Sequence, residues 1–340
     1  MKHTGKITII LLSMFILTQL IGLFVLMNNP LDIQVTENET IQDVLDYQEP
    51  ETTREYVGAF SSIVFAFIIA ILILLALMSF KIEFILKAWF FLVIVIALTL
   101  AFLAIQDSLP VLITLKTAII ISLALALPLA YMKLFKRYII VHNLTELLIY
   151  PGIAAVFVPI LNFFTMILLL LVISAYDMWA VWHSGVMQKM AKYQIKQLKV
   201  FSGFFVPYLS PSQRKKIKKE KEKYKAAKTK KEKAKFMNKK IKTSVAILGG
   251  GDVIFPIITA GVMLKTFGTV SMGALNVPLA SLLVIVGATS GLAYLFLSSE
   301  KKKFYPAMPF ITSGIFIAIA LSWIIYTKFL GIVVSLWPLA

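Results

Sequence analysis

The 340-residue chain contains no cysteine, three histidines and few charged residues, which make up 15% of it. The absence of cysteine excludes thiolate nucleophiles, iron–sulfur ligation and cysteine-based zinc sites. An average soluble domain has about 25% charged and about 45–50% apolar residues, whereas this chain is 59% hydrophobic with a mean hydropathy of +0.86. The composition excludes a soluble globular enzyme and a disordered or disulfide-stapled secreted chain. It predicts an all-α polytopic membrane protein.

The apolar residues occur in nine long runs. A helix needs about 20 apolar residues to cross about 30 Å of hydrocarbon. The nine predicted spans are Ile7–Met27, Val57–Phe80, Ile82–Ile105, Leu109–Ala130, Tyr138–Val158, Ile160–Trp182, Ser244–Phe267, Ala274–Leu297 and Met308–Leu330. We interpret the first run as a retained span, because it is longer than a signal-peptide core and no cleavage pattern follows it.

The net charge of +17 is concentrated in one segment. Residues 183–243 hold 20 Lys and Arg against three Asp and Glu, and the positive and negative charges in the rest of the chain cancel. We therefore divide the chain into an N-terminal membrane part with six spans (1–182), a basic loop (183–243) and a C-terminal membrane part with three spans (244–340). Positive residues favour the cytoplasmic side, which predicts a cell-membrane protein with its N-terminus cytoplasmic and its C-terminus outside. The loop is expected to attract anionic lipids, and this distribution does not indicate nucleic-acid binding.

Two aspartates lie within the predicted spans. Inserting a charged residue within a membrane span costs about 2.5–3.5 kcal/mol of free energy, so a charge at such a position indicates a structural or functional role. Asp177 lies roughly 8 Å from the inner end of the sixth span, and Asp252 roughly 12 Å from the inner start of the seventh. Both carboxylates are therefore predicted to lie at a similar depth below the same membrane surface. We interpret them as a pair in a wet cavity within the membrane, the alternative being that each bonds to neighbouring backbone or Lys.

Such a pair has well-defined chemistry. Two carboxylates a few ångströms apart cannot both ionise, so they share a proton and titrate as a unit. The ionised member can take a proton from water while the protonated member donates to a peptide carbonyl oxygen. Water attack then gives a tetrahedral gem-diol, and reversed roles protonate the leaving amine. This chemistry needs neither a cofactor nor a metal, and none is predicted.

Two short motifs accompany the aspartates. Gly249, Gly250 and Gly251 directly precede Asp252, where they weaken a helix but allow close approach of another backbone; small-residue helix packing is the alternative explanation. Pro306, Ala307 and Met308 stand at the inner start of the ninth span. Proline at a helix start is ordinary, but this turn falls on the same side of the membrane as both aspartates.

The order Tyr176-Asp177, Gly249-Gly250-Gly251-Asp252, Pro306-Ala307-Met308 resembles the presenilin and signal peptide peptidase family of GxGD intramembrane aspartyl proteases. That family carries YD, GxGD and PAL motifs on nine spans, and Met308 departs from the final Leu. The resemblance implies that Asp177 and Asp252 are the catalytic dyad. It implies that Tyr176, Gly249–Gly251 and Pro306–Met308 line a substrate site, and that the substrates are transmembrane segments. The predicted orientation is similar to the presenilin branch, and the length to archaeal presenilin homologues.

Several alternatives stay open. An ion- or proton-coupled transporter would use the same acid pair to carry protons, and a membrane scaffold would need neither acid. His142 and Glu146 are four residues apart on one helix face, which predicts a structural pair rather than a catalytic one. The apolar stretch Val200–Leu209 is expected to lie in the membrane interface. The oligomeric state is not predicted.

Overall fold

The computed structural model describes residues 5–31, 34–36, 39–40, 50–80, 83–109, 114–136, 138–184, 202–208, 213, 244–272, 275–299 and 305–330. Its long helices are α1 (Gly5–Met27), α3 (Thr53–Phe80), α4 (Glu83–Asp107), α5 (Leu115–Tyr131), α6 (Ile139–Phe157), α7 (Phe163–Trp179), α11 (Gly250–Phe267), α12 (Leu279–Ser298) and α13 (Met308–Ile324). Three π-helical turns follow helices: η1 (Met132–Lys136), η2 (Ala180–Ser184) and η4 (Ile325–Phe329). The strands are β1 (Gln34–Thr36), β2 (Glu39–Thr40), β3 (Gly203–Tyr208), β4 (Ser244–Gly249), β5 (Val270–Met272) and β6 (Leu275–Val277).

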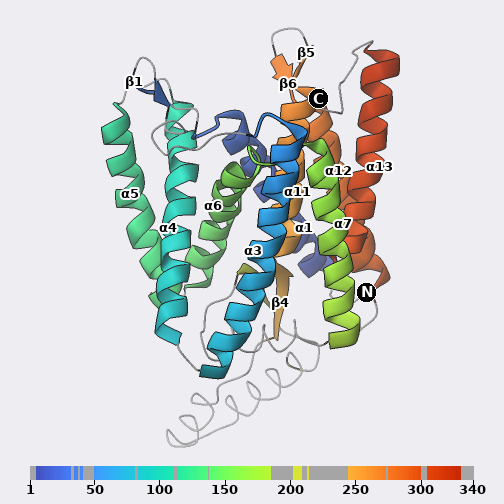
Figure 1. The fold of residues 1–340 in the computed structure, drawn as a ribbon. Helices are drawn as coiled ribbons and strands as arrows, with labels where there is room; N and C mark the ends of the chain where they lie inside the picture. The colour runs from blue at the N-terminus through green and yellow to red at the C-terminus, as the bar shows by residue number, and fades with distance from the viewer. Residues whose placement is uncertain are drawn as a thin grey trace, which may run out of the picture.

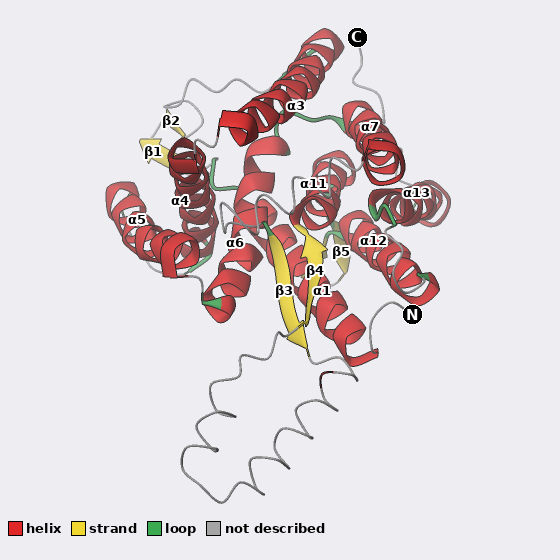
Figure 2. Ribbon diagram, turned by 90° about the horizontal axis from the view of Figure 1, so that it is seen from below, coloured by secondary structure: helices red, strands yellow, loops and turns green. Residues whose placement is uncertain are grey.

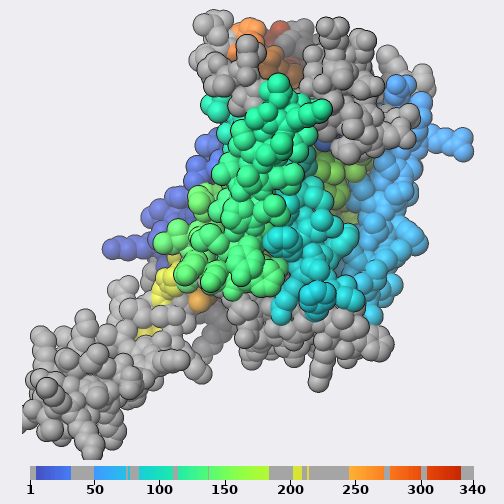
Figure 3. All heavy atoms as spheres, turned by 90° about the vertical axis from the view of Figure 1, so that its left-hand side faces the viewer, coloured from blue at the N-terminus to red at the C-terminus, as the bar shows by residue number. Residues whose placement is uncertain are grey.

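Within the described residues, nine helices are long and apolar enough to cross a membrane. This confirms the predicted all-α, nine-span membrane fold. The helices stand side by side in one bundle (Figure 1). Many of their outward side chains are large and apolar, such as Ile120, Leu123 and Leu127 on α5, and the face that includes α5, α4 and α3 is shown in Figure 3. Such a surface can contact lipid tails directly and does not have to be buried by other parts of a protein, because hydrocarbon is as apolar as the side chains.

Helix α11 lies at the centre of the bundle. It packs against α1, α6, α7, α12 and α13 and is the most buried of the nine described spans, whereas α3 is the least buried. The main core cluster collects Val253, Ile257 and Met263 of α11 with apolar residues from the surrounding helices. A residue at the start of α11 is therefore held from several sides.

The structure corrects three predicted boundaries. Residues 244–249 were expected to open the seventh helix, but they form β4, and α11 begins at Gly250. The fourth and eighth helices also begin later than predicted, at Leu115 and Leu279, the latter after the hairpin of β5 and β6. Asp252 consequently lies in the first turn of its helix and not eight residues into it.

Strands β3 and β4 form an antiparallel pair with Gly203 opposite Gly249. Figure 2 shows the pair between α6, α1 and α11. In the segment expected to lie in the membrane interface, residues 203–208 thus form a strand, and Phe204 is fully buried in the protein core. Most of the basic loop, including residues 214–243, lies outside the described residues.

Candidate active site

Three helix ends meet at one end of the bundle. Helix α7 finishes there, and both α11 and α13 start there, so the predicted motifs come together although they are far apart in the sequence. α7 contacts α11 and α13 directly. α7 therefore runs antiparallel to α11 and α13, as the alternating passage of the chain through the bundle requires (Figure 1).

Asp177 lies near the end of α7 and is buried, with 8% of its surface exposed. The backbone N–H of Met308 donates a hydrogen bond of 3.0 Å to Asp177 Oδ2, and the backbone of Ala307 also interacts with this carboxylate. Met308 is the first residue of α13. The free N–H groups and the positive end of the helix dipole favour a carboxylate at this position.

A second hydrogen bond holds α7 and α13 in register. Ser174 Oγ and Thr312 Oγ1 are 2.8 Å apart and buried. They lie about one helical turn from Asp177 and Met308, toward the interior of the bundle. Ser174 and Thr312 were not identified from the sequence, in which isolated hydroxyl residues of apolar helices give no distinctive signal.

Asp252 lies in the first turn of α11 and is partly buried. Its side chain folds back toward the helix start: it interacts with the backbone of Gly249, the N-cap residue. This resembles one half of a capping box, in which the third helical residue bonds back to the N-cap N–H. Because α7 contacts α11 and ends where α11 begins, Asp177 and Asp252 lie at the same end of the bundle.

The three glycines have different surroundings. A Cβ on Gly249 would lie 3.1 Å from Asp252 Oδ2, and a Cβ on Gly251 would meet its first neighbour, Phe255, at 3.9 Å. A Cβ on Gly250, by contrast, would lie 2.5 Å from Ser202 Oγ and 2.8 Å from Tyr150 Oη. Gly250 is therefore the glycine whose position has no room for a side chain. Gly251 is exposed.

Tyr176 and Pro306 lie beside the dyad in different ways. The ring of Tyr176 packs edge-on against Phe67 of α3, with ring centroids 5.4 Å apart. Pro306 is buried just before α13. Tyr176 thus links α7 to the least buried helix of the bundle.

The predicted structural pair of His142 and Glu146 is confirmed. Glu146 Oε1 lies 3.5 Å from His142 Nε2 and forms an ion pair with Lys133. The same α6 face carries Tyr150, whose hydroxyl lies 3.5 Å from Ser202 Oγ. Sequence reasoning missed Tyr150, although its spacing of four residues from Glu146 places it on the same helix face.

No group of three or more His, Asp or Glu residues suited to a metal ion occurs in the part of the chain that the structure describes. The candidate site consists of two carboxylates, the backbone N–H groups at two helix starts, and the end of a two-stranded sheet.

Residues 12–327 match the family model described as signal-peptide peptidase, presenilin aspartyl protease. The fold is similar to a presenilin family intramembrane aspartate protease solved in space group C222, with 16% identity, a TM-score of 0.50, and coverage of 92% of this chain and 94% of that one. A second structure of such a protease, in space group P2, matches with 15% identity, a TM-score of 0.50, and coverage of 92% and 96%. A search of curated protein sequences finds no match.

Proposed function

Because the chain belongs to the signal-peptide peptidase and presenilin family of aspartyl proteases, we propose that it is a GxGD-type endopeptidase that hydrolyses peptide bonds within transmembrane segments. Asp177 and Asp252 are the proposed catalytic dyad. The observation that carries this proposal is geometric: α7 ends where the contacting helix α11 begins, so Asp177, held by the Met308 N–H, and Asp252 lie at the same end of the bundle.

In the proposed mechanism one carboxylate is ionised and accepts a proton from water. The other is protonated and donates to the carbonyl oxygen of the scissile peptide, and attack of the water oxygen on the carbonyl carbon gives a gem-diol. When this intermediate collapses, the C–N bond breaks, the carboxyl group that took a proton from water gives it to the leaving nitrogen, and the other carboxylate takes a proton from a gem-diol hydroxyl. One water is consumed, and each carboxyl group returns to its starting protonation state.

The dyad is tested by cleavage of a transmembrane substrate in detergent. Asp177→Asn and Asp252→Asn keep the size of each side chain but remove its acid–base function, so each should lower kcat by at least about a hundredfold. Asp107→Asn, at the exposed end of α4, is the matched control and should cleave like wild type. Wild-type cleavage by either dyad variant would contradict the proposal; coupled ion flux in proteoliposomes that depends on both acids would instead favour a transporter.

A helical substrate hides its peptide bonds in its own hydrogen bonds and must unwind before hydrolysis. We propose that the unwound segment pairs with the free edge of β4. Among the described residues β4 has β3 as its strand neighbour on one edge, and it ends at Gly249, beside Asp252. Backbone pairing of this kind accepts many side-chain sequences.

Strand pairing predicts a two-residue period in the substrate. Successive N–H groups of a strand point to opposite edges. N-methylation of single substrate amides near the cleavage position should therefore raise KM at alternate positions and leave the intervening ones nearly unaffected. Measuring KM across such a series tests the pairing, and a uniform effect along the series would rule it out.

A further inference from the structure

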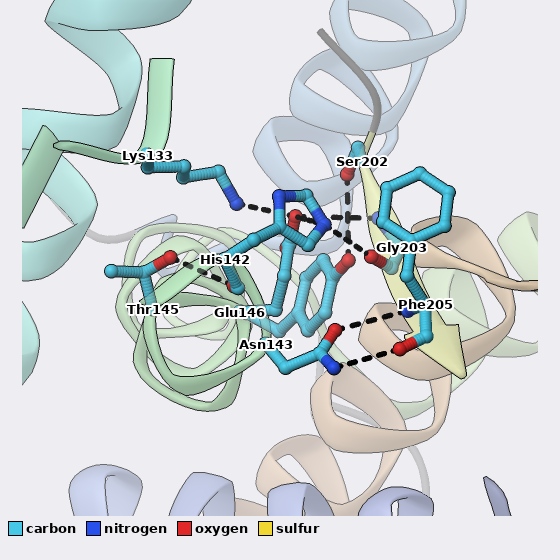
Figure 4. A network of polar contacts seen from close by, with 9 residues as sticks. Lys133, His142, Asn143, Thr145, Glu146, Ser202, Gly203 and Phe205 are labelled. Carbon is cyan, nitrogen blue, oxygen red and sulfur yellow. Dashed lines mark hydrogen bonds and ion pairs between the residues drawn. The ribbon is translucent and has the colours of Figure 1, made fainter. Parts of the chain in front are cut away.

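A buried ionic cluster lies on α6 and η1. Glu146 is 1% exposed, Lys133 6% and His142 8%. Glu146 Oε1 accepts a hydrogen bond from Lys133 Nζ and a second one, of 3.3 Å, from the backbone N–H of Gly203. Figure 4 shows these side chains meeting at the start of β3.

The same helix face fastens β3 through two more residues. His142 Nε2 lies 2.7 Å from the carbonyl oxygen of Gly203. Asn143 donates to the Phe205 carbonyl oxygen at 2.8 Å and accepts from the Phe205 N–H at 3.0 Å. Side chains of α6 thus occupy the backbone groups that a third strand would otherwise take.

Strand β3 in turn supports the turn that carries Asp252. The carbonyl oxygen of Ser202 accepts a 3.3 Å hydrogen bond from Gly250 N–H, and Gly203 pairs with Gly249 across the sheet. A continuous series of polar contacts therefore runs from Glu146 through Gly203 and Gly249 to the first turn of α11.

Stability alone does not account for this cluster. Charges are expensive within a membrane-spanning helix, and well-packed apolar residues of similar volume often stabilise a protein as much as a buried ion pair does. The cluster instead gives β3 directional bonds that apolar packing cannot supply.

We infer that Lys133, His142, Asn143 and Glu146 form a positioning clamp that fixes β3 against α6 and, through β3, holds Asp252 in place opposite Asp177. These residues act through the strand and not on the substrate. The catalytic consequence of the clamp rests on the proposed protease function, whereas its structural consequence can be measured without it.

Two double variants separate the clamp from simple burial of charge. Lys133→Met with Glu146→Gln, and Lys133→Met with Glu146→Leu, both remove the ion pair without leaving one buried charge unpaired. The side chains at 146 are similar in size, but Gln keeps an oxygen for the Gly203 N–H and Leu does not. Asn143→Leu, at a partly exposed position, removes both hydrogen bonds to Phe205. It tests the clamp independently if the double variants do not fold.

Cleavage is measured per active site, titrated with a hydroxyl-containing analogue of the gem-diol, so that unfolded enzyme does not contribute. The Gln double variant should keep kcat within about threefold of wild type. The Leu double variant and Asn143→Leu should lose roughly ten- to a hundredfold, because small displacements of catalytic groups have effects of that size.

Hydrogen exchange followed by mass spectrometry gives a readout that does not depend on proteolysis. Amides of β4 and the first turn of α11 should exchange faster in the Leu double variant than in the Gln double variant, while α12 and α13 stay unchanged. If wild type does not cleave transmembrane substrates, the protease proposal fails and this exchange comparison still decides the clamp. Equal exchange at β4 and the α11 start in all variants would overturn the clamp.

Discussion

At the scale of single residues, the contact between α13 and the dyad is made by main chain. The group that donates to Asp177 is the backbone N–H of Met308, which any residue other than proline supplies. The departure from the family's final Leu therefore does not alter this hydrogen bond. Met308 is only 3% exposed and belongs to the main core cluster, where its side chain has a packing role.

Met308→Leu should therefore be nearly silent. The exchange conserves volume, and such swaps usually cost less than about 1.5 kcal/mol. We expect a thermal midpoint close to that of wild type and a kcat within about threefold, measured on the same transmembrane substrate. A tenfold loss of kcat with an unchanged midpoint would show instead that the side chain at 308 recognises substrate.

The glycines before Asp252 should differ in their tolerance of a methyl group. In Gly250→Ala the new Cβ meets Tyr150 and Ser202, and we expect a loss of about 1–3 kcal/mol in unfolding free energy, as in other overpacked sites. Gly251→Ala places its Cβ in nearly open space and should fold like wild type. Thermal unfolding of the two variants checks this order, and equal midpoints would contradict it. A folded Gly251→Ala enzyme without activity would place substrate against that residue.

At the scale of elements, the position of α13 is set by its crossing with α12. Gly287 and Gly291 of α12 face the backbone of α13 at Gly314 and Phe310, and Cβ atoms at these glycines would overlap backbone atoms of the neighbouring helix. Such close helix crossings are typical of small residues in membrane proteins. Because α13 begins at Met308, this crossing also places the N–H group that binds Asp177.

Gly314→Ala should therefore affect the active site indirectly, through the position of α13. We expect it to lower the unfolding free energy by about 1–3 kcal/mol and to reduce cleavage, since α13 must shift. Gly58→Ala on exposed α3, where a Cβ meets nothing within 4 Å, is the matched control and should be neutral or stabilising by up to about 1 kcal/mol. Denaturation in detergent compares the two, and equal stability of both variants would contradict the crossing argument.

The length of an apolar run predicted the nine helices well, because a bilayer imposes that length. Run length did not predict the correct start of the seventh helix, because an apolar strand leads directly into that helix. In β4 the exposed Val245 and Ile247 alternate with buried Ala246 and Leu248, a two-residue period that is hidden when the six residues are read together with the apolar run that follows. Its partner β3 ends at Tyr208, whereas β4 begins at Ser244, and periodicity does not reveal pairing over that separation.

At the scale of the whole molecule, the sequence predicted that the motifs share one end of the bundle, because alternation of spans fixes the direction of each helix. It did not predict which side chains touch. The bond between Met308 and Asp177, the role of Tyr150 behind Gly250, and the clamp around Glu146 all depend on helix rotation and on β3. These are properties of packing between elements, which a pattern within one element does not contain.

The orientation of the bundle in the membrane is a prediction that the cysteine-free sequence makes easy to test. Gly5, at the start of α1, and Ser271, in β5 after the end of α11, are exposed at opposite ends of the bundle. The positive-inside rule predicts that the end with Gly5 and the aspartates is cytoplasmic.

A membrane-impermeant maleimide applied to intact cells should therefore label Ser271→Cys, and should label Gly5→Cys only after the membrane is permeabilised. Wild type, which has no thiol, is the background control. The reverse pattern would place the dyad on the outer side and contradict the predicted orientation. The proposed substrates would then be segments reached from outside the cell, because the carboxylates lie close to the end of the bundle at which α7 finishes and α11 starts.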